Sequence, residues 1–183
     1  ILIQEALAFE RPAYAHIPLI LAPDRSKMSK RHGSVSIHEY REQGFLKEAL
    51  VNFIAMLGWN PGTEQELFSI EELIDAFTLD QVQKSGAIFN IDKLKWFNHE
   101  WIKQMKPKQQ TQQLLHALEE FPDLQTIVKN SPAAQRDILD RISTFGELTD
   151  LARAGEYDLY VKRLDYSAEQ LVWKKDPDPK ATK

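Results

Sequence analysis

Residues 16–33 read HIPLILAPDRSKMSKRHG, and three kinds of sequence follow one another in this stretch. The first six residues are mostly apolar and predict a short buried strand within residues 13–21. Pro18 has no backbone N–H, which places this strand at a sheet edge or makes Pro18 its start. Residues 23–26, Pro-Asp-Arg-Ser, predict a turn. Residues 27–33 then form a basic loop that ends in glycine, which we call the signature loop.

The signature loop has the composition of a phosphate-binding loop. Lys27 and Lys30 stand three residues apart, Ser26 and Ser29 add hydroxyl donors, and Gly33 lets the backbone turn. Two charges about 4 Å apart interact with roughly 4 kcal/mol at an effective dielectric constant of about 20. A loop with this charge can therefore hold a triphosphate. A solvated basic loop is the alternative, and the sequence has no Gly-x-x-x-x-Gly-Lys-Ser/Thr string, so the loop is not a P-loop.

The rest of the chain predicts a mostly α-helical fold. Ser36 and Ser69 each stand three residues before a glutamate, the pattern of a capping box, and Thr78 with Gln81 repeats it. Apolar residues recur with a helical period over residues 45–57, which predicts a core helix. One predicted helix ends at about residue 10, and two others start after Ser36 and Ser167. The remaining predicted helices cover residues 45–57, 70–77, 91–105, 109–120, 133–142 and 144–154. Asn90, Ser131 and Thr144 are the predicted N-caps of the helices at 91–105, 133–142 and 144–154.

Other signals mark where these helices stop. Gly44 interrupts the helix after Ser36, and Gly58 is predicted to cap the helix 45–57. Residues 60–62, Asn-Pro-Gly, predict a turn. Trp96, Phe97 and Trp101 are predicted to lie in the core. The charged tail Lys174–Lys183, with its two prolines, predicts a linker.

Composition limits the classes of protein. The 183 residues carry a net charge of −4 and contain no cysteine, which excludes disulfides and thiolate zinc sites and favours a reducing compartment, the cytoplasm. No apolar run is long enough to span a membrane. No metal site is expected, because His99 has no second His or Cys at ligand spacing. The apolar opening Ile1–Phe9 begins as if within a helix, which predicts that the sequence is part of a longer chain.

The strand, turn and signature loop together resemble the second signature of class I aminoacyl-tRNA synthetases. His32-Gly33 is similar to the glutamate–tRNA ligases within that class. The resemblance is strong to about Met105 and loose beyond Pro107. It continues through Gly44-Phe45-Leu46-Lys47-Glu48-Ala49-Leu50, Asn52-Phe53, Leu57-Gly58-Trp59 and Ile88-Phe89-Asn90-Ile91-Asp92-Lys93-Leu94-Lys95-Trp96.

The resemblance implies a domain order. Residues 1–35 would end a catalytic domain and carry the signature loop. Residues 36–106 would form a helical stem-contact domain, and residues 107–183 the first part of a helical anticodon-binding domain with a linker. The first class I signature, a His-Ile-Gly-His-like string, does not occur in the sequence. We therefore expect the chain to be inactive alone, since the glutamate pocket would lie in another part of the parent protein.

The resemblance also implies an activity. The parent would join glutamate and ATP, with Mg²⁺, into glutamyl-adenylate and then transfer the glutamyl group to tRNA(Glu). Lys30 would stabilise the departing pyrophosphate and Lys27 would assist. The backbone at Met28 would lie against the adenine, and Ser29 would help to hold the loop. Whether tRNA(Gln) is also charged stays open, and a monomer is expected.

Contacts with tRNA are expected from Arg31, His32, Lys93 and Lys95. Alternatively, His32 packs within the loop. The basic stretch that includes Lys103, Lys106 and Lys108 is alternatively a helix face exposed to solvent. Three other functions compete with the ligase. One is a non-catalytic helical tRNA-binding module, another a helical adaptor, and the third a piece of a glutamine–tRNA ligase, which the His-Gly pair and the helical continuation disfavour.

Overall fold

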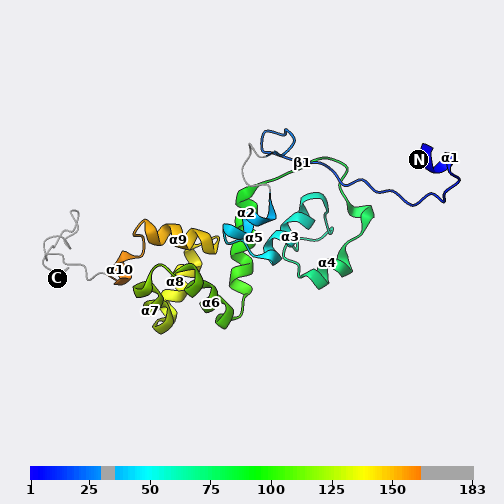
Figure 1. The fold of residues 1–183 in the computed structure, drawn as a ribbon. Coiled ribbons are helices and arrows are strands. Elements are labelled where there is room, and N and C mark those ends of the chain that lie inside the picture. Colours follow the sequence, from blue (N-terminus) through cyan, green and yellow to red (C-terminus); the bar gives the residue numbers. More distant parts are fainter. Residues whose placement is uncertain (30–35, 162–183) are drawn as a thin grey trace, which may run out of the picture. The chain divides into compact units, whose positions relative to one another are not determined.

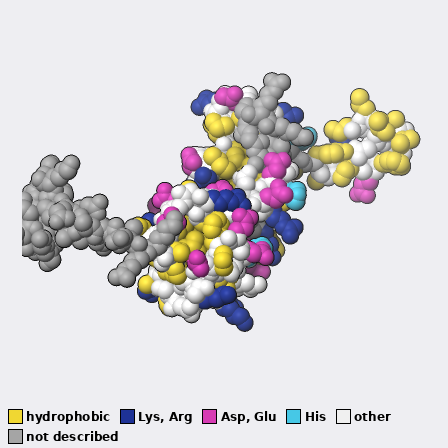
Figure 2. Space-filling view, turned by 60° about the vertical axis from the view of Figure 1, so that its left-hand side comes forward, with side chains coloured by type: hydrophobic (Ala, Val, Ile, Leu, Met, Phe, Trp, Pro, Cys, Tyr) yellow, Lys and Arg dark blue, Asp and Glu magenta, His cyan; other side chains and the backbone are white. Residues whose placement is uncertain are grey.

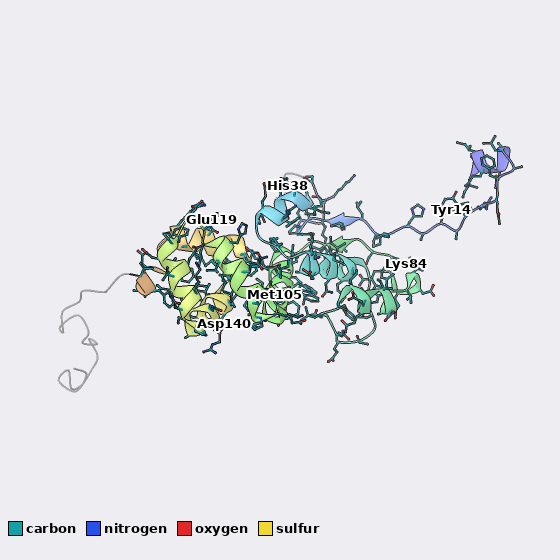
Figure 3. The ribbon with its side chains drawn as sticks, turned by 60° about the horizontal axis from the view of Figure 1, so that its bottom comes forward. Tyr14, His38, Lys84, Met105, Glu119 and Asp140 are labelled. Carbon is teal, nitrogen blue, oxygen red and sulfur yellow. The ribbon has the colours of Figure 1, made fainter. Side chains whose placement is uncertain are left out.

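The computed structural model describes residues 1–29 and 36–161, and it is mostly helical (Figure 1). The predicted helical fold is therefore confirmed. The chain divides into two compact units, Ile1–Met105 and Lys106–Lys183. Met105, labelled in Figure 3, follows helix α5 (Ile91–Gln104) and ends the first unit. Among the described residues, no helix is long and apolar enough to cross a membrane.

The first unit begins with the short helix α1 (Leu2–Ala6), which confirms the predicted helix but ends before residue 10. None of its residues is buried. Figure 2 shows hydrophobic side chains on the surface of this N-terminal segment. The exposed apolar side chains are Ile1, Leu2, Ile3, Leu7 and Phe9.

The predicted buried strand is wrong in length and in burial. Strand β1 covers only Ile20–Leu21 and pairs in parallel with β2 (Ala87–Ile88). Ile17 is 75% exposed and Leu19 is 53% exposed. β2 offers two residues for pairing, and Pro18 cannot donate a ladder hydrogen bond. Within the described ranges, pairing with β2 therefore reaches back only to the carbonyl oxygen of Leu19, and the side chains of Ile17 and Leu19 stay exposed.

Helices α2 (Ile37–Glu42) and α3 (Lys47–Gly58) follow the signature loop. The side chain of Ser36 accepts a hydrogen bond of 3.2 Å from the backbone N–H of Glu39, as predicted for an N-cap. Gly44 separates the two helices with a φ of 78°, a value that favours glycine. The predicted role of Gly58 is wrong, because Gly58 is the last helical residue and Trp59, with a φ of −135°, is the C-cap.

The core of the first unit forms where α3 packs against α5. Asn90 starts α5, and its side chain accepts hydrogen bonds from the backbone N–H groups of Asp92 and Lys93 at 2.9 and 3.2 Å. Trp96 is 39% exposed, which corrects its predicted core position. The buried cluster consists of Tyr40, Phe45, Ala49, Leu50, Phe53, Phe89, Leu94 and Phe97.

A smaller cluster forms around the fully buried Trp59, which packs with Phe68 and Leu73. Helix α4 (Ile70–Ala76) begins with the predicted capping box, in which Ser69 and Glu72 satisfy each other's backbone N–H groups. The third capping box is not formed. Residues Leu79–Gln81 make one 3₁₀ turn, η2, and Thr78 does not cap it through its side chain.

The second unit is helical throughout its described part. Ser131 and Thr144 are N-caps, as predicted, and accept hydrogen bonds from the backbone N–H groups of Ala134 and Glu147. Its helices are α6 (Pro107–Ala117), α7 (Pro122–Asn130), α8 (Pro132–Arg141), α9 (Phe145–Arg153) and α10 (Asp158–Val161). Helix α7 was not predicted. The predicted helix after Ser167 and the predicted linker lie outside the described residues.

Candidate functional site

The signature loop begins on a tight hairpin. After β1 the chain turns back, so that Lys27 lies opposite Leu21 in an antiparallel bridge. The backbone N–H of Met28 donates a hydrogen bond of 3.2 Å to the carbonyl oxygen of Ile20. On the other edge of β1, the carbonyl oxygens of Leu19 and Leu21 accept bonds from β2 and the residue after it. β1 is therefore held on both edges, and it fixes where Lys27 leaves the sheet.

The turn of this hairpin confirms the predicted turn at residues 23–26. The backbone N–H of Arg25 donates to the carbonyl oxygen of Ala22, and that of Ala22 donates to the carbonyl oxygen of Ser26, both at 2.8 Å. Asp24 accepts from the backbone N–H of Ser26 at 2.9 Å and from its hydroxyl at 2.7 Å. Arg25 has a φ of 65°, in the left-handed region. The Asp24 contacts support this turn locally, as aspartate side chains often do.

A cavity of about 460 Å³ lies beside the hairpin. Lys27 and Met28 line it from the hairpin, and Tyr40 and Phe89 line it from the helical core. Its size falls in the range of small-ligand pockets, roughly 300–1,000 Å³. The other described lining residues are Ile17, Pro18, Leu19, Ile20, Ile37, Leu50, Ile54 and Leu57, so among the described residues Lys27 supplies the one charged side chain of this lining.

The structure brings together Lys27 and Met28 of the predicted site residues. Lys27 is exposed at the cavity, and Met28 is half-buried and packs against the apolar core of the first unit. Ser29 follows Met28 and is half-buried. Lys30, Arg31 and His32 lie outside the described residues. The described end of the signature loop is thus anchored through the Met28 side chain.

Tyr40 is a lining residue that the sequence did not single out. It lies on α2 and is buried, and its ring packs edge-on against Phe45, with the ring centroids 5.6 Å apart. Burial raises the pKa of the Tyr40 hydroxyl, and the negative charge of Glu39 raises it further. Tyr40 therefore stays neutral at physiological pH. The spacing of Ile37 and Tyr40 on one helix face is the only sequence signal that pointed to this wall of the cavity.

Lys93 and Lys95, the other predicted tRNA contacts, lie on α5 and are not among the residues that line the cavity. The Lys93 ammonium donates hydrogen bonds of 2.7 Å to both carboxylate oxygens of Glu66. It also lies 4.0 Å from the centroid of the Trp96 ring, within the range of a cation–π contact. Lys95 is exposed. The positive charge of Lys93 is therefore paired with the negative charge of Glu66. The basic stretch did not predict this ion pair.

Asn52 positions the segment that carries Glu66. It is completely buried on α3. Its side-chain NH₂ donates to the carbonyl oxygen of Glu66, and its oxygen accepts from the backbone N–H of Phe68, both at 3.0 Å. The same oxygen lies 3.3 Å from the indole nitrogen of Trp101, which donates to it. One buried amide thus ties α3, α5 and the segment before α4 together.

Comparison with known proteins identifies the family. Residues 1–96 match the family of tRNA synthetases class I (E and Q), catalytic domain. The match covers more than half of the chain, and the chain therefore belongs to this family. Within it, the relatives are named glutamate–tRNA ligase, which confirms the resemblance found in the signature loop.

Two of these relatives show how much of the ligase the chain represents. The glutamate–tRNA ligase of Carboxydothermus hydrogenoformans is 60% identical over 103 residues, which cover 56% of this chain and 22% of the relative. That of Moorella thermoacetica is 42% identical over 160 residues, which cover 83% of this chain and 32% of the relative. The chain thus spans between a fifth and a third of the length of these two ligases.

Solved structures agree with the fold. The crystal structure of glutamate–tRNA synthetase from Elizabethkingia anophelis matches with a TM-score of 0.70 and 29% sequence identity, and the match covers 92% of this chain and 37% of that one. The enzyme from Elizabethkingia meningosepticum, solved in complex with its amino acid, matches with the same score and identity over 95% of this chain. These matches extend beyond residue 96 into the second unit.

Proposed function

We propose that this chain is the part of a glutamate–tRNA ligase that carries the second class I signature and the helices that follow it. The parent enzyme activates glutamate with ATP and transfers it to tRNA(Glu). The observation that carries this proposal is the hairpin, which delivers Lys27 to the edge of an apolar cavity and leads directly into Ser29 and Lys30. The 183-residue chain by itself forms no adenylate.

Four residues of the signature loop have proposed roles in binding ATP. Lys27 and Lys30 bind the phosphates of ATP, and Lys30 stabilises the pyrophosphate as it leaves. The backbone at Met28 lies against the adenine, and Ser29 holds the loop. Support for these roles comes from the anchored Met28 and from the family match, which includes the whole loop. Mg²⁺ accompanies ATP and supplies further positive charge to the same phosphates.

The helical parts are proposed to bind tRNA. Residues 36–106 act as the stem-contact domain, and residues 107–183 form the first part of an anticodon-binding domain with a linker. The division of the chain into units at Met105 and Lys106 supports this assignment, because two compact units can serve two parts of one tRNA. Arg31, His32, Lys93 and Lys95 are proposed to contact the tRNA. Contacts of this kind position a nucleic acid rather than read its sequence.

The test is a charging assay. The intact enzyme that contains this sequence is incubated with labelled glutamate, ATP and either tRNA(Glu) or tRNA(Gln), and acid-insoluble label is counted. We expect tRNA(Glu) to be charged. Label on tRNA(Gln) as well would show that the enzyme charges both tRNAs with glutamate. A folded enzyme that binds ATP and charges neither tRNA would contradict the proposal and favour a non-catalytic tRNA-binding module.

The isolated chain supplies a second test. ATP–pyrophosphate exchange in the presence of glutamate measures adenylate formation without tRNA. The 183-residue chain is expected to show none, while the intact enzyme shows exchange under the same conditions. Pyrophosphate exchange catalysed by the chain alone would show that adenylate forms without the first signature and the glutamate pocket of the rest of the enzyme. This result would overturn this part of the proposal.

A further inference from the structure

Two glycines of the first unit lie close to residues 18–21, the segment that contains β1 and leads to the signature loop. A Cβ atom placed on Gly86 would lie 2.7 Å from Cδ1 and 3.0 Å from Cγ of Leu21, and 3.2 Å from the carbonyl oxygen of Leu19. A Cβ atom on Gly58 would lie 3.2 Å from Cγ of Pro18. Gly86 belongs to the segment that leads to β2, in which Figure 3 labels Lys84.

The contact at Gly86 is the tighter of the two. Non-bonded carbon atoms attract one another best at about 3.5–4.0 Å, so an atom at 2.7 Å must move its neighbour. The Leu21 side chain is half-buried and can rotate, but the Leu19 carbonyl is part of the backbone and already accepts a hydrogen bond of 3.1 Å from Ala87. Gly86 does not have a positive φ. Glycine is therefore required here because a side chain would collide with Leu21 and Leu19, and not because the backbone adopts a conformation that only glycine favours.

This contact bears on the hairpin because β1 is shared. β2 and the residue after it hold one edge of β1 through the backbone N–H groups of Ala87 and Phe89. The Met28 backbone holds the other edge. A shift of β1 away from β2 would therefore carry Lys27 and Met28 with it, away from the core wall formed by Phe89 and Tyr40.

We propose that Gly86 is a positioning residue, whose missing side chain lets β2 approach Leu21 and Leu19 closely and so fixes Lys27 and Met28 at the cavity. The link to ATP rests on the proposed ligase function. The link to the position of the hairpin does not, and the two are tested separately.

The first experiment measures amide hydrogen exchange in the 183-residue chain. Gly86→Ala is expected to speed exchange at Ala87, Phe89 and Met28 by about tenfold, because local opening of β1 exposes these N–H groups. Leu21→Ala removes Cδ1 and Cγ of Leu21, the two nearest atoms that an alanine at residue 86 would meet, and leaves the Leu19 carbonyl oxygen at 3.2 Å. The double variant Gly86→Ala/Leu21→Ala is therefore expected to exchange more slowly than Gly86→Ala and close to the rate of Leu21→Ala, a non-additive result that identifies contacting residues.

The control is Gly146→Ala, the same chemical change within α9 of the second unit, which should leave these three amides unaffected. Unchanged exchange in Gly86→Ala would overturn the proposal, as would a double variant that is no slower than Gly86→Ala. Should Gly86→Ala fail to fold, a folded double variant with protected amides supports the contact, and an unfolded double variant overturns it.

The second experiment uses the intact enzyme. Gly86→Ala is expected to raise the KM for ATP in pyrophosphate exchange severalfold, to leave the KM for glutamate unchanged, and to be restored by Leu21→Ala. A smaller folded fraction would lower kcat without changing either KM. An unchanged KM for ATP in a variant with faster amide exchange would overturn the positioning role. An intact wild-type enzyme without pyrophosphate exchange activity would instead refute the ligase function. The amide hydrogen exchange measurement would still test the contact between Gly86 and Leu21.

Discussion

The side-chain oxygen of Asn98, on α5, accepts a hydrogen bond of 2.7 Å from the backbone N–H of Leu46, the residue that precedes α3. Leu46 has no side chain that can cap a helix, so a residue 52 positions later in the sequence takes part in ordering the start of α3. Asn98 is completely buried. The two main helices of the first unit are thus joined by a polar contact as well as by their apolar core.

Asn98→Ala is expected to destabilise the first unit by about 1–3 kcal/mol, because it leaves the partly buried Leu46 N–H without its acceptor. Urea unfolding of the 183-residue chain, followed by tryptophan fluorescence, measures this change, since Trp59, Trp96 and Trp101 all lie in the first unit. Asn98→Asp keeps an acceptor and serves as the comparison. Equal stability of Asn98→Ala and the wild type would show that water satisfies the Leu46 N–H equally well.

Asn52→Ala is expected to cost more, about 2–4 kcal/mol, because it leaves both the Phe68 N–H and the Glu66 carbonyl without their partner. Asn52→Leu fills the space but restores neither hydrogen bond, so it should be nearly as unstable. The same unfolding measurement applies. A leucine variant as stable as the wild type would mean that packing, rather than hydrogen bonding, determines the residue at this position.

Local sequence signals predicted the helix starts well. Ser36, Ser69, Asn90, Ser131 and Thr144 all cap helices, because a capping side chain bonds to a backbone N–H two or three residues away. Helix α7 was missed although Pro122 stands at its first turn and Leu124 and Val128 form its buried face. Its start lacks a side-chain cap, the signal that carried the predictions at Ser36, Ser69, Asn90, Ser131 and Thr144.

Contacts between distant residues could not be predicted. The length of β1 depends on how many residues β2 offers, 67 positions later, and not on the apolar run around Pro18. The ion pair of Lys93 depends on Glu66, which lies 27 residues away and whose backbone carbonyl oxygen is held by Asn52. The cavity beside Lys27 depends on Tyr40 and Phe89 from different segments. Such features follow from the packing of distant segments, so neither a basic stretch nor a strand pattern in the sequence predicts them.

Lys30→Ala in the intact enzyme is expected to slow glutamate-dependent pyrophosphate exchange by a factor on the order of 10²–10³, since one lost donor to developing charge costs about this much. Lys27→Ala should have a smaller effect, as the assisting residue. Lys84→Ala, which removes a lysine elsewhere in the first unit, is the matched control and should retain the wild-type rate. A Lys30→Ala enzyme with the wild-type rate would remove this residue from the mechanism.

Lys95→Ala is expected to weaken tRNA binding more than Lys93→Ala does, because Glu66 already pairs with Lys93 at 2.7 Å. Each lost phosphate contact should reduce the slope of log affinity against log salt concentration by roughly 0.9. Glu66→Gln releases the charge of Lys93 and should strengthen binding at low salt. Titrations of tRNA(Glu) at several salt concentrations measure both effects. Larger losses in Lys93→Ala than in Lys95→Ala would show that the Glu66 pair opens when tRNA binds.

Tyr157 gives the second unit a dependence on alkaline pH. Its side chain is 2% exposed, and burial raises the pKa of its hydroxyl from 10.0 to about 12. The hydroxyl has no hydrogen-bond partner among the described residues. In the unfolded chain the hydroxyl ionises near pH 10, whereas in the folded unit it stays protonated, so ionisation stabilises the unfolded state as the pH rises. Stability is therefore fully present below about pH 10 and falls between about pH 10 and 12.

Tyr157→Phe is expected to remove this loss, which amounts to as much as roughly 2–3 kcal/mol at the upper end of the range. At neutral pH the variant should be at least as stable as the wild type, because the phenylalanine leaves no unpaired buried hydroxyl. Urea unfolding followed by far-ultraviolet circular dichroism at several pH values compares the variant with Tyr14→Phe, a matched change in the first unit. If both variants lose stability in parallel with the wild type, then Tyr157 ionises in the folded protein as easily as in the unfolded chain, and other groups cause the alkaline loss.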